Sequence, residues 1–284
     1  MKVIITGAEG QLGLDLVAAC SAAGDDVIAA GRVSLDITDR GLVLGTIGEL
    51  EPDVVVHAAA WTAVDACEDA PERAYQVNAM GCRHVAEGCR RVGAHLVAVS
   101  TDYVFDGTKW DPYTEWDEPN PLSVYGRSKL GGEREVLHGC PGATVVRTSW
   151  VSGAGGANMV KTILRLASDP DRDLAFVDDQ FGRPTFTADL APVLRTLAVA
   201  RAPGIYHAAN QGVTTWHAFA QDVLEAAGLD RSRVRAIATA ELDPPRAASR
   251  PFRAVLDDLA LRAGGFELLP DHHASLQRLV KELL

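Results

Sequence analysis

The sequence lacks the features of a secreted, membrane-spanning or metal-stapled chain. Its five cysteines are an odd number and form no CxxC pair, so they predict neither a disulfide framework nor a zinc site. No apolar run reaches membrane-spanning length, and there is no repeat or low-complexity tract. The N-terminus leads directly into the strand-like segment Val3-Ile4-Ile5, so we expect no signal peptide, no membrane association and a cytoplasmic location.

Positive charge is also scarce. Lys and Arg number 27 against 38 Asp and Glu, giving a net charge of -11. Such a surface repels nucleic acid and anionic membranes, so an anionic ligand would need a local basic pocket. With 284 residues and 47% hydrophobic content, the chain is long enough to bury a substantial core.

Short apolar runs alternate with helical patterns over the first 150 residues. This alternation predicts βαβ units, and hence an α/β fold with a Rossmann-type doubly wound parallel sheet. The expected strands are Lys2–Thr6, Asp26–Ala30, Asp53–His57, His95–Ser100 and Thr144–Thr148. The expected helices are Gln11–Ala23, about 39–50, Pro71–Val92 and one that carries Tyr125 and Lys129.

The pattern loosens after residue 150, where short strands mix with helices. We therefore expect a dinucleotide-binding domain over 1–150 and a smaller, mainly substrate-binding region over 151–284. Segments at about 186–208 are candidates to rejoin the main sheet.

A glycine-rich loop follows the first expected strand and opens the first helix. Gly7, Gly10 and Gly13 have the spacing GxxGxxG and enclose Gln11 and Leu12. Glycines there allow a tight turn and let the backbone approach a pyrophosphate at the helix N-terminus. The triplet alone also fits an ordinary tight loop, but its place in a βαβ unit favours dinucleotide binding.

Two later strand ends carry further candidate cofactor residues. Arg32 follows the second strand, where an arginine can accept the 2′-phosphate of NADPH and an acidic residue would bind the NADH ribose. Arg32 favours NADPH, although it also fits solvated surface, and NADH stays open. The other candidates are Asp36 and Ile37 beside the adenine, and Ala58, Ala59 and Ala60 after the third strand.

Three residues can reduce a ketone together with a hydride donor. Thr101 and Asp102 end the fourth strand, where open α/β sheets place ligands. Tyr125 and Lys129 lie one helical turn apart, so they share a helix face, and a nearby ammonium favours the phenolate. Tyr125 could then pass a proton to a substrate oxygen, with Thr101 as a second donor. The alternative is a purely structural role, in which the threonine caps a helix and the tyrosine and lysine lie on the surface.

These motifs resemble the extended short-chain dehydrogenase/reductase superfamily, and within it the dTDP-4-dehydrorhamnose reductase family. The glycine loop and the Tyr125/Lys129 pair are typical of the superfamily. The more specific matches are the blocks Ser100 to Gly107 and Asp179 to Thr185. Further matching stretches are His57 to Asp65, Val77-Asn78-Ala79, Tyr125 to Leu130 and Arg147-Thr148-Ser149-Trp150.

The resemblance implies an NADPH-dependent or NADH-dependent enzyme that reduces C4 of a 4-keto sugar held as its dTDP ester, the final step towards activated L-rhamnose. It implies a monomer or homodimer whose catalytic residues are Thr101, Tyr125 and Lys129. Thr101, Asp102, Tyr125 and Trp150 would face the sugar. The residues that would contact the cofactor are Gly10, Gln11, Leu12, Asp36, Ile37, Ala59, Ala60, Tyr125 and Lys129.

Two departures from the family pattern concern the substrate. His57 stands where the family commonly has Asn, and Arg253-Ala254 stand where it has Asn-Ser, which leaves another dTDP-4-keto-deoxysugar open. Arg246, Arg250 and Arg253 form a basic cluster, and arginine forks suit a diphosphate. We expect Arg250 to hold the nucleotide diphosphate; a solvated arginine face is the alternative.

Three other functions share this fold. A 4,6-dehydratase needs an acid directly after Thr-Asp, where this chain has Tyr103. A 4-epimerase uses the same hydride chemistry reversibly and would retain its cofactor. A non-catalytic regulatory subunit of reductase-like fold is opposed, but not excluded, by the intact Thr101, Tyr125 and Lys129.

No metal is assigned to the active site. Some relatives use a divalent metal such as Mg²⁺ at a dimer contact, for which Asp15 and Asp189 are plausible here, although scattered carboxylates are normally solvated surface. His272 and His273 are adjacent in sequence, so we expect their rings to diverge on a helix and to make a poor metal pair.

Overall fold

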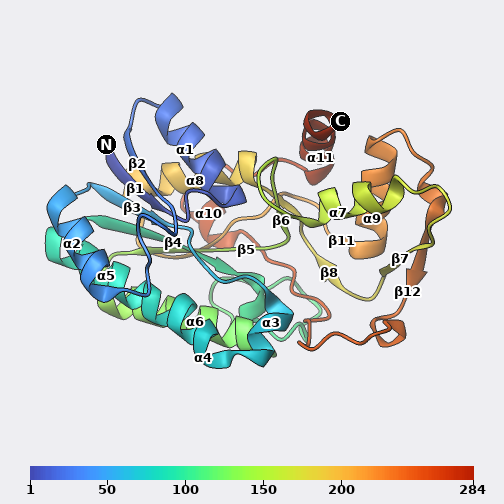
Figure 1. Cartoon of the computed structure of the whole chain (residues 1–284), viewed down its shortest axis with the longest axis horizontal. Coiled ribbons are helices and arrows are strands. Elements are labelled where there is room, and N and C mark those ends of the chain that lie inside the picture. Colours follow the sequence, from blue (N-terminus) through green and yellow to red (C-terminus); the bar gives the residue numbers. More distant parts are fainter.

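A computed structural model describes residues 1–284 and places a parallel sheet at the centre of the molecule (Figure 1). Its six strands lie in the order β2-β1-β3-β4-β5-β10, and every neighbouring pair is parallel. The strands are β1 (Lys2–Thr6), β2 (Asp26–Ala30), β3 (Val54–His57), β4 (His95–Thr101), β5 (Thr144–Thr148) and β10 (Gly204–His207). The expected Rossmann-type α/β fold is confirmed.

Helices cover both faces of this sheet, which is why β3 and β5 are buried along their whole length. One face packs against α1 (Gln11–Ala22), α8 (Thr187–Ala200) and α10 (Leu259–Ala263). The other packs against α2 (Arg40–Leu50), α5 (Gly81–Val92) and α6 (Val124–Gly139). The strand order reverses between β1 and β3, and open α/β sheets bind ligands in the crevice at such a point.

The long helix expected over Pro71–Val92 is divided by a π-helical turn. α4 (Pro71–Tyr75) leads into the turn at Gln76–Met80, and α5 follows without a break. Within the turn, Asn78 accepts a hydrogen bond from the Trp61 backbone N–H at 2.8 Å and donates one to Ser128 Oγ at 3.0 Å. The turn therefore joins the loop after β3 to α6. That loop continues into the short helix α3 (Val64–Asp69).

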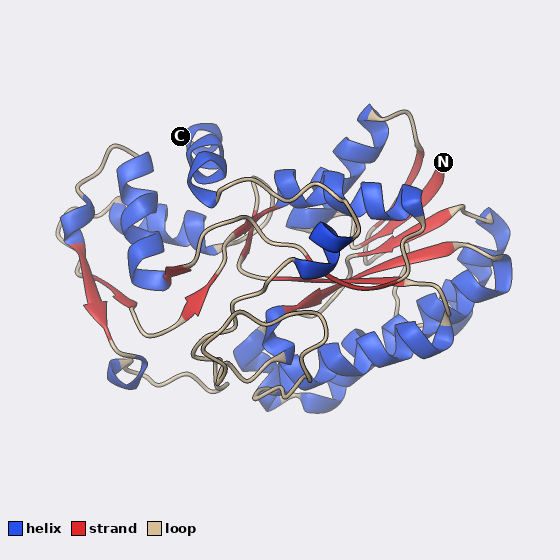
Figure 2. Cartoon of the chain, turned by 180° about the vertical axis from the view of Figure 1, so that it is seen from behind, coloured by secondary structure: helices blue, strands red, loops and turns tan.

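A smaller region lies beside the sheet and has its own apolar core. Its helices are α7 (Met159–Ala167), α9 (Trp216–Ala226) and α11 (His272–Leu283), and its main strand pair is β7 (Leu174–Val177) with β12 (Val234–Ile237). Two shorter strand pairs join β6 (Val151–Ser152) to β9 (Thr185–Phe186), and β8 (Phe181–Gly182) to β11 (Thr214–Thr215). Figure 2 shows the β7–β12 pair at the end of the molecule opposite the N-terminus.

Two segments after residue 150 return to the sheet. β10 pairs with β5 at the sheet edge, and α8 packs against α1. The chain thus crosses between the two regions more than once. None of its helices has both the length and the apolar character needed to cross a bilayer.

Candidate active site

The first cavity, of about 360 Å³, lies beyond the carboxyl ends of β1, β2 and β3. Gly7 has φ +69°, and a side chain there would lie 2.8 Å from the Ala59 backbone, so this turn requires glycine. α1 begins after Gly10, and no side chain caps it, which leaves its first N–H groups free for an anion. The loop therefore fits the pyrophosphate of a dinucleotide.

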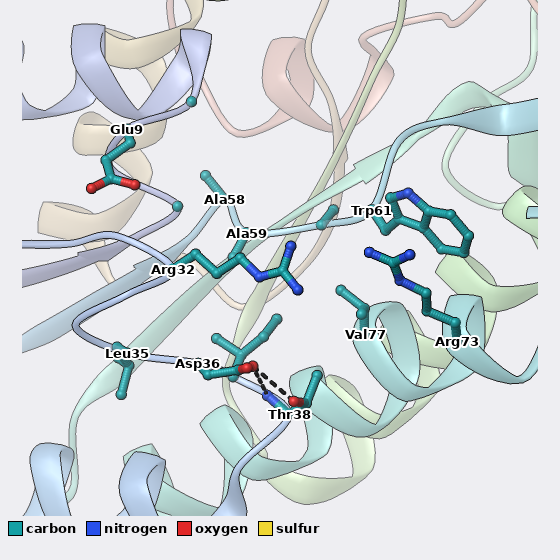
Figure 3. Close-up of a pocket in the computed structure, with 14 residues that line it drawn as sticks. Glu9, Arg32, Leu35, Asp36, Thr38, Ala58, Ala59, Trp61, Arg73 and Val77 are labelled. Atoms are coloured by element: carbon teal, nitrogen blue, oxygen red, sulfur yellow. Dashed lines mark hydrogen bonds between the residues drawn. The ribbon is translucent and has the colours of Figure 1, made fainter. Parts of the chain in front are cut away.

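Two arginines reach this cavity (Figure 3). Arg32 follows β2, and Arg73 of α4 lies 4.5 Å from the centre of the Trp61 ring. Asp36 also lines the cavity and accepts hydrogen bonds from Thr38 N at 2.9 Å and Thr38 Oγ1 at 2.7 Å, which lower the pKa of Asp36. The cavity thus combines two cationic side chains with an ordered turn.

Most of the expected cofactor residues line this first cavity, and others line the next. Residues of the first are Gly7, Gly10, Arg32, Asp36, Ile37, Ala58, Ala59 and Ala60. The sequence analysis missed Glu9, Thr38, Trp61 and Arg73, which also line it. The position of Arg73 at this cavity could not be predicted from the sequence, because Arg73 lies on a helix that the sheet pattern does not place near β2.

The second cavity, of about 400 Å³, adjoins the first and shares Gly7, Gly10, Ala58 and Ala60 with it. It brings together all three expected catalytic residues with the remaining glycine-loop residues. Its expected members are Gln11, Leu12, Gly13, Thr101, Asp102, Tyr125, Lys129 and Trp150. Groups from β4, α6 and the glycine loop therefore face one space.

Tyr125 is buried, and the direction of its pKa differs from the sequence-based expectation. Burial raises the pKa of the phenol, and the hydrogen bond from Thr101 only partly opposes this. Tyr103 packs edge-on against the Tyr125 ring, with centroids 5.5 Å apart. The expected lowering by Lys129 is wrong for this structure, because the removal of the phenol from water dominates. A phenol that keeps its proton at neutral pH is a proton donor.

Lys129 is also buried, and its ammonium donates to Val99 O at 2.8 Å. Burial lowers the pKa of Lys129. His57, which departs from the family pattern, shares a 2.7 Å hydrogen bond with Thr6 Oγ1. Burial and the Lys129 charge lower the pKa of His57 to about 3, so it is neutral beneath the site.

Asp102 carries the strongest electrostatic feature of the cleft. It is 2% exposed, and burial raises its pKa to about 7 even though Thr101 Oγ1 donates to its Oδ1 at 3.0 Å. The carboxyl therefore changes charge near neutral pH. Because Thr101 also lies against Tyr125, a proton on Asp102 alters the hydrogen bonding of both hydroxyls.

Two stacked indoles close the cleft on the side of the smaller region. The rings of Trp150 and Trp216 lie 3.7 Å apart and 10° from parallel. Trp150 has φ +46°, an unusual conformation for a bulky residue. Trp216 begins α9, and the sequence analysis did not single it out, because stacking partners distant in sequence leave no local pattern.

Arg250 does not line either cavity. It donates twice to Asp65, at 2.5 and 2.6 Å, and hydrogen-bonds to Tyr103. It borders a small recess next to the cleft, together with Asp102, Tyr103, Trp150 and Trp216. The basic cluster is divided: Arg246 lies 3.7 Å from the same Asp65, whereas Arg253 donates to Trp110 O.

One of the two carboxylates considered for Mg²⁺, that of Asp189, is engaged in other contacts. Asp189 binds Arg278 through one oxygen, and Asn210 and Ser275 through the other. This arrangement gives no support to a metal at Asp189.

The expectation for the adjacent histidines is wrong. The rings of His272 and His273 stack with centroids 4.0 Å apart instead of diverging. They stand at the first turn of α11, where hydrogen bonds to Gln211 O and Asp271 turn both rings to the same side.

A Rossmann sheet with a glycine loop, and with Thr101, Tyr125 and Lys129 at one sheet edge, defines the extended short-chain dehydrogenase/reductase class. The family model for the RmlD substrate binding domain matches residues 1–284. The chain belongs to this family.

Curated relatives and solved structures agree with this family. A dTDP-4-dehydrorhamnose reductase of Streptomyces griseus is 47% identical over 96% of this chain and 91% of its own length. A dTDP-4-keto-6-deoxy-D-glucose reductase of Streptomyces niveus is 38% identical over 95% of this chain and 92% of its own. The structure of dTDP-4-dehydrorhamnose reductase from Bacillus anthracis in complex with NADP has a TM-score of 0.94 and 37% identity, covering 99% of this chain and 100% of that one.

Proposed function

We propose that this chain is an NADPH-dependent oxidoreductase that reduces the C4 ketone of dTDP-4-dehydro-β-L-rhamnose to dTDP-L-rhamnose, the last step of dTDP-rhamnose biosynthesis. The observation that carries the proposal is one cleft that contains Thr101, Tyr125 and Lys129 beside the glycine loop. Reductases of dTDP-4-dehydrorhamnose related over nearly the full length support it. Because the step acts on a nucleotide sugar, we propose a cytoplasmic location.

The nicotinamide, when bound, supplies the hydride that reaches C4. Tyr125 then donates its phenolic proton to the oxygen that becomes negative. Tyr125 carries this proton at neutral pH, because the ordinary pKa of a phenol is 10.0 and burial raises it further. Thr101, which donates to Asp102 Oδ1 in this structure, turns its single hydroxyl hydrogen to the same oxygen, where it orients the ketone and stabilises the developing charge.

Lys129 has two roles in this proposal. Its ammonium is held within the cleft by Val99 O and stabilises the phenolate that remains after proton transfer. It also anchors the nicotinamide ribose. Asn78 positions the adjoining segment, since its amide bridges Trp61 and Ser128, the residue before Lys129.

NADPH is proposed over NADH because of Arg32. An arginine at the end of β2 can pair with a 2′-phosphate through two parallel hydrogen bonds. Arg73 brings a second guanidinium to the same cavity (Figure 3). The uncapped start of α1 would hold the pyrophosphate between this cavity and the catalytic cleft.

The sugar nucleotide is proposed to lie on the side of the smaller region. Asp102 and Trp150 would face the sugar, and the stacked Trp150 and Trp216 form an apolar wall suited to a deoxysugar methyl group. Arg250 would reach the diphosphate from the adjoining recess after exchanging part of its pairing with Asp65.

The test supplies dTDP-4-dehydro-L-rhamnose with NADPH or NADH, follows the loss of nicotinamide absorbance, and identifies the product sugar by NMR. We expect one equivalent of NADPH consumed for each dTDP-L-rhamnose formed. Product formation without net cofactor consumption would indicate an epimerase instead. An absence of turnover, together with stable capture of a partner enzyme, would indicate a regulatory subunit.

A second candidate is a reductase of another dTDP-4-keto-deoxysugar. The observation that favours it is the Arg253-Ala254 pair: Arg253 lies over the rings of Trp110 and Phe181, and Ala254 is buried in the recess below Trp150. The similar Streptomyces niveus relative is named for a different keto sugar. Comparison of kcat/KM for the two keto sugars distinguishes the candidates.

A further inference from the structure

A group of potential metal ligands lies where α9 meets α11, and none of its members lines the cleft. Asp222 comes from α9, and His272 and His273 open α11. One ligand atom from each residue lies within 4.8 Å of the others. His272 is 2% exposed, whereas the His273 side chain is 58% exposed, so the group extends from the interior to solvent.

Hydrogen bonds at Nδ1 fix the orientation of both imidazoles. His272 Nδ1 lies 3.0 Å from Gln211 O, and a carbonyl oxygen only accepts, so this nitrogen carries the hydrogen. His273 Nδ1 donates to Asp271 Oδ1 at 2.8 Å in the same way. Each neutral ring therefore presents the lone pair of Nε2. Metal-binding histidines are commonly held by such a bond at the other nitrogen.

Both Nε2 atoms lie near the same carboxylate. Asp222 Oδ2 lies 3.9 Å from His272 Nε2 and 3.5 Å from His273 Nε2. His272 Nε2 is buried and has no hydrogen-bond partner. Three acceptors therefore lie close together, an arrangement that a bound cation or a proton would stabilise.

The charged groups around Asp222 leave room for that cation. Arg231 approaches Asp222 Oδ1 at 3.6 Å, but its closer partner is Glu225, at 2.6 Å. The contact of Arg231 is with Asp222 Oδ1, whereas Asp222 Oδ2 is the oxygen nearest to both histidines. The acceptor separations of 3.5 and 3.9 Å lie near the roughly 3.3 Å between ligands around a tetrahedral zinc.

We propose that Asp222, His272 and His273 bind one divalent transition-metal ion of the Zn²⁺ class, with water completing its coordination. Two imidazoles and one carboxylate favour Zn²⁺ over Mg²⁺, which prefers oxygen ligands. The ion would join α11 to α9, the helix that begins with Trp216 at the cleft. It would brace the smaller region and take no part in hydride transfer, so this inference does not depend on the proposed activity.

The test uses full-length protein without a histidine tag, freed of metal by a chelator and then dialysed. Zn²⁺ is added in a calorimetric titration, and Co²⁺ is used as a visible-absorption probe of tetrahedral coordination. We expect one equivalent to bind and the melting temperature to rise on binding. His273→Gln and Asp222→Asn should weaken binding at least about tenfold, since each removes one of three ligands.

His138→Gln is the matched control. His138 is also bonded through Nδ1 to a carbonyl, that of Arg134, but it has no carboxylate partner, so its loss should leave binding unchanged. His273 is exposed, so His273→Gln tests the site even if a change at buried His272 prevents folding. Failure to bind one saturable equivalent, or equal binding by wild type and His273→Gln, would overturn the proposal. A melting temperature that responds to pH through His273 but not to Zn²⁺ would show that a proton fills the site instead.

Discussion

The two sides of the cleft are assembled in different ways. On the cofactor side, each group lies at the carboxyl end of a strand of the sheet: Gly7 follows β1, Arg32 is the second residue after β2, Ala58 follows β3 and Thr101 ends β4. Their positions follow from the parallel topology, which brings the carboxyl ends of all these strands to one edge.

On the sugar side, the groups come from distant parts of the chain. Trp150 follows β5, Trp216 begins α9, and Arg250 lies in a late loop paired with Asp65. No single element positions them. The cofactor side therefore follows from the sheet topology, whereas the sugar side depends on how the smaller region packs, so substitutions should affect the two sides separately.

The largest effect is expected at the boundary between the two sides. Tyr125→Phe should lower kcat by about 10²- to 10⁴-fold, because it removes the proton donor but keeps the ring. Affinity for NADPH and KM for the sugar should change little. Steady-state kinetics and a fluorescence titration of NADPH measure these quantities.

The matched control is Tyr75→Phe, at an exposed tyrosine of α4. It should keep full activity. Turnover by Tyr125→Phe close to the wild-type value would contradict the mechanism.

Gly13→Ala should disrupt the glycine loop on the cofactor side of the cleft. The new Cβ would overlap Gly7 O and lie 2.6 Å from Ala8 Cα, both backbone atoms, so the glycine loop must move. We expect NADPH affinity to fall at least about tenfold, together with a lower melting temperature.

Gly48→Ala is the control, because a Cβ on this α2 residue meets nothing within 4 Å. It should stabilise the protein by about 0.5–1 kcal/mol. If both glycine variants bind NADPH like the wild type, the loop does not hold the pyrophosphate.

Asp102→Asn should remove a pH dependence of stability. Burial raises the pKa of Asp102 from 3.8 to about 7, so the folded state binds its proton more tightly than the unfolded state. This contribution to stability is complete below pH 3.8 and is lost as the pH rises through about 7. The free energy of unfolding falls by about 1.4 kcal/mol for each pKa unit by which the folded value exceeds the unfolded one.

Urea unfolding of the wild type and of Asp102→Asn across this pH range measures the effect. The free energy of unfolding of the wild type should fall relative to that of the variant as the pH rises. Parallel curves would mean that Asp102 ionises normally.

Arg250→Ala should affect the sugar side alone. Loss of charge-assisted hydrogen bonds to the diphosphate, each worth about 1.5–3 kcal/mol, should raise KM for the dTDP-sugar about 10- to 100-fold and leave NADPH affinity unchanged. Arg246→Ala is the control, since Arg246 is 3.7 Å from the same Asp65 but 48% exposed. An unchanged KM for Arg250→Ala would remove Arg250 from the substrate site.

Arg32→Ala should affect the cofactor side alone, and by the smallest amount. We expect NADPH to bind about tenfold more weakly, because one exposed contact to the phosphate is lost. NADH binding should stay unchanged. Arg40→Ala, which removes an exposed arginine of α2 bound to Glu87, is the control. Equal losses for both cofactors would show that Arg32 does not read the 2′-phosphate.

The sequence predicted the sheet closely because its signals are local. Lys2–Thr6, Asp26–Ala30 and Thr144–Thr148 were expected as strands and occur with those bounds. Thr101, Tyr125 and Lys129 could be grouped because strand ends and helix turns have fixed geometry, and the structure brings them to one cleft. Their catalytic roles stay predictions.

The features that sequence reasoning missed depend on contacts between distant segments. The pairing of Arg250 with Asp65 joins a late loop to α3, and no pattern in either segment indicates it. The pKa of Tyr125 was predicted in the wrong direction because burial, which outweighs the charge of Lys129, is a property of the whole fold. The stacking of His272 on His273 was missed because it depends on Gln211 and Asp271.

The π-helical turn at Gln76–Met80 gives one long helix two phases. Before it, α4 directs Arg73 to Trp61 at the cofactor cavity; after it, α5 turns Gly81 and Gly88 towards Ile37 and Ile47. The π-helical turn holds about one residue more than a regular α-helical turn, and this lets α4 and α5 each direct their side chains to these partners. If the same residues formed a regular α-helix instead, α5 would be rotated against α4 by about 100°. The wide turn is therefore what keeps Arg73 at the cofactor cavity while Gly81 faces Ile37.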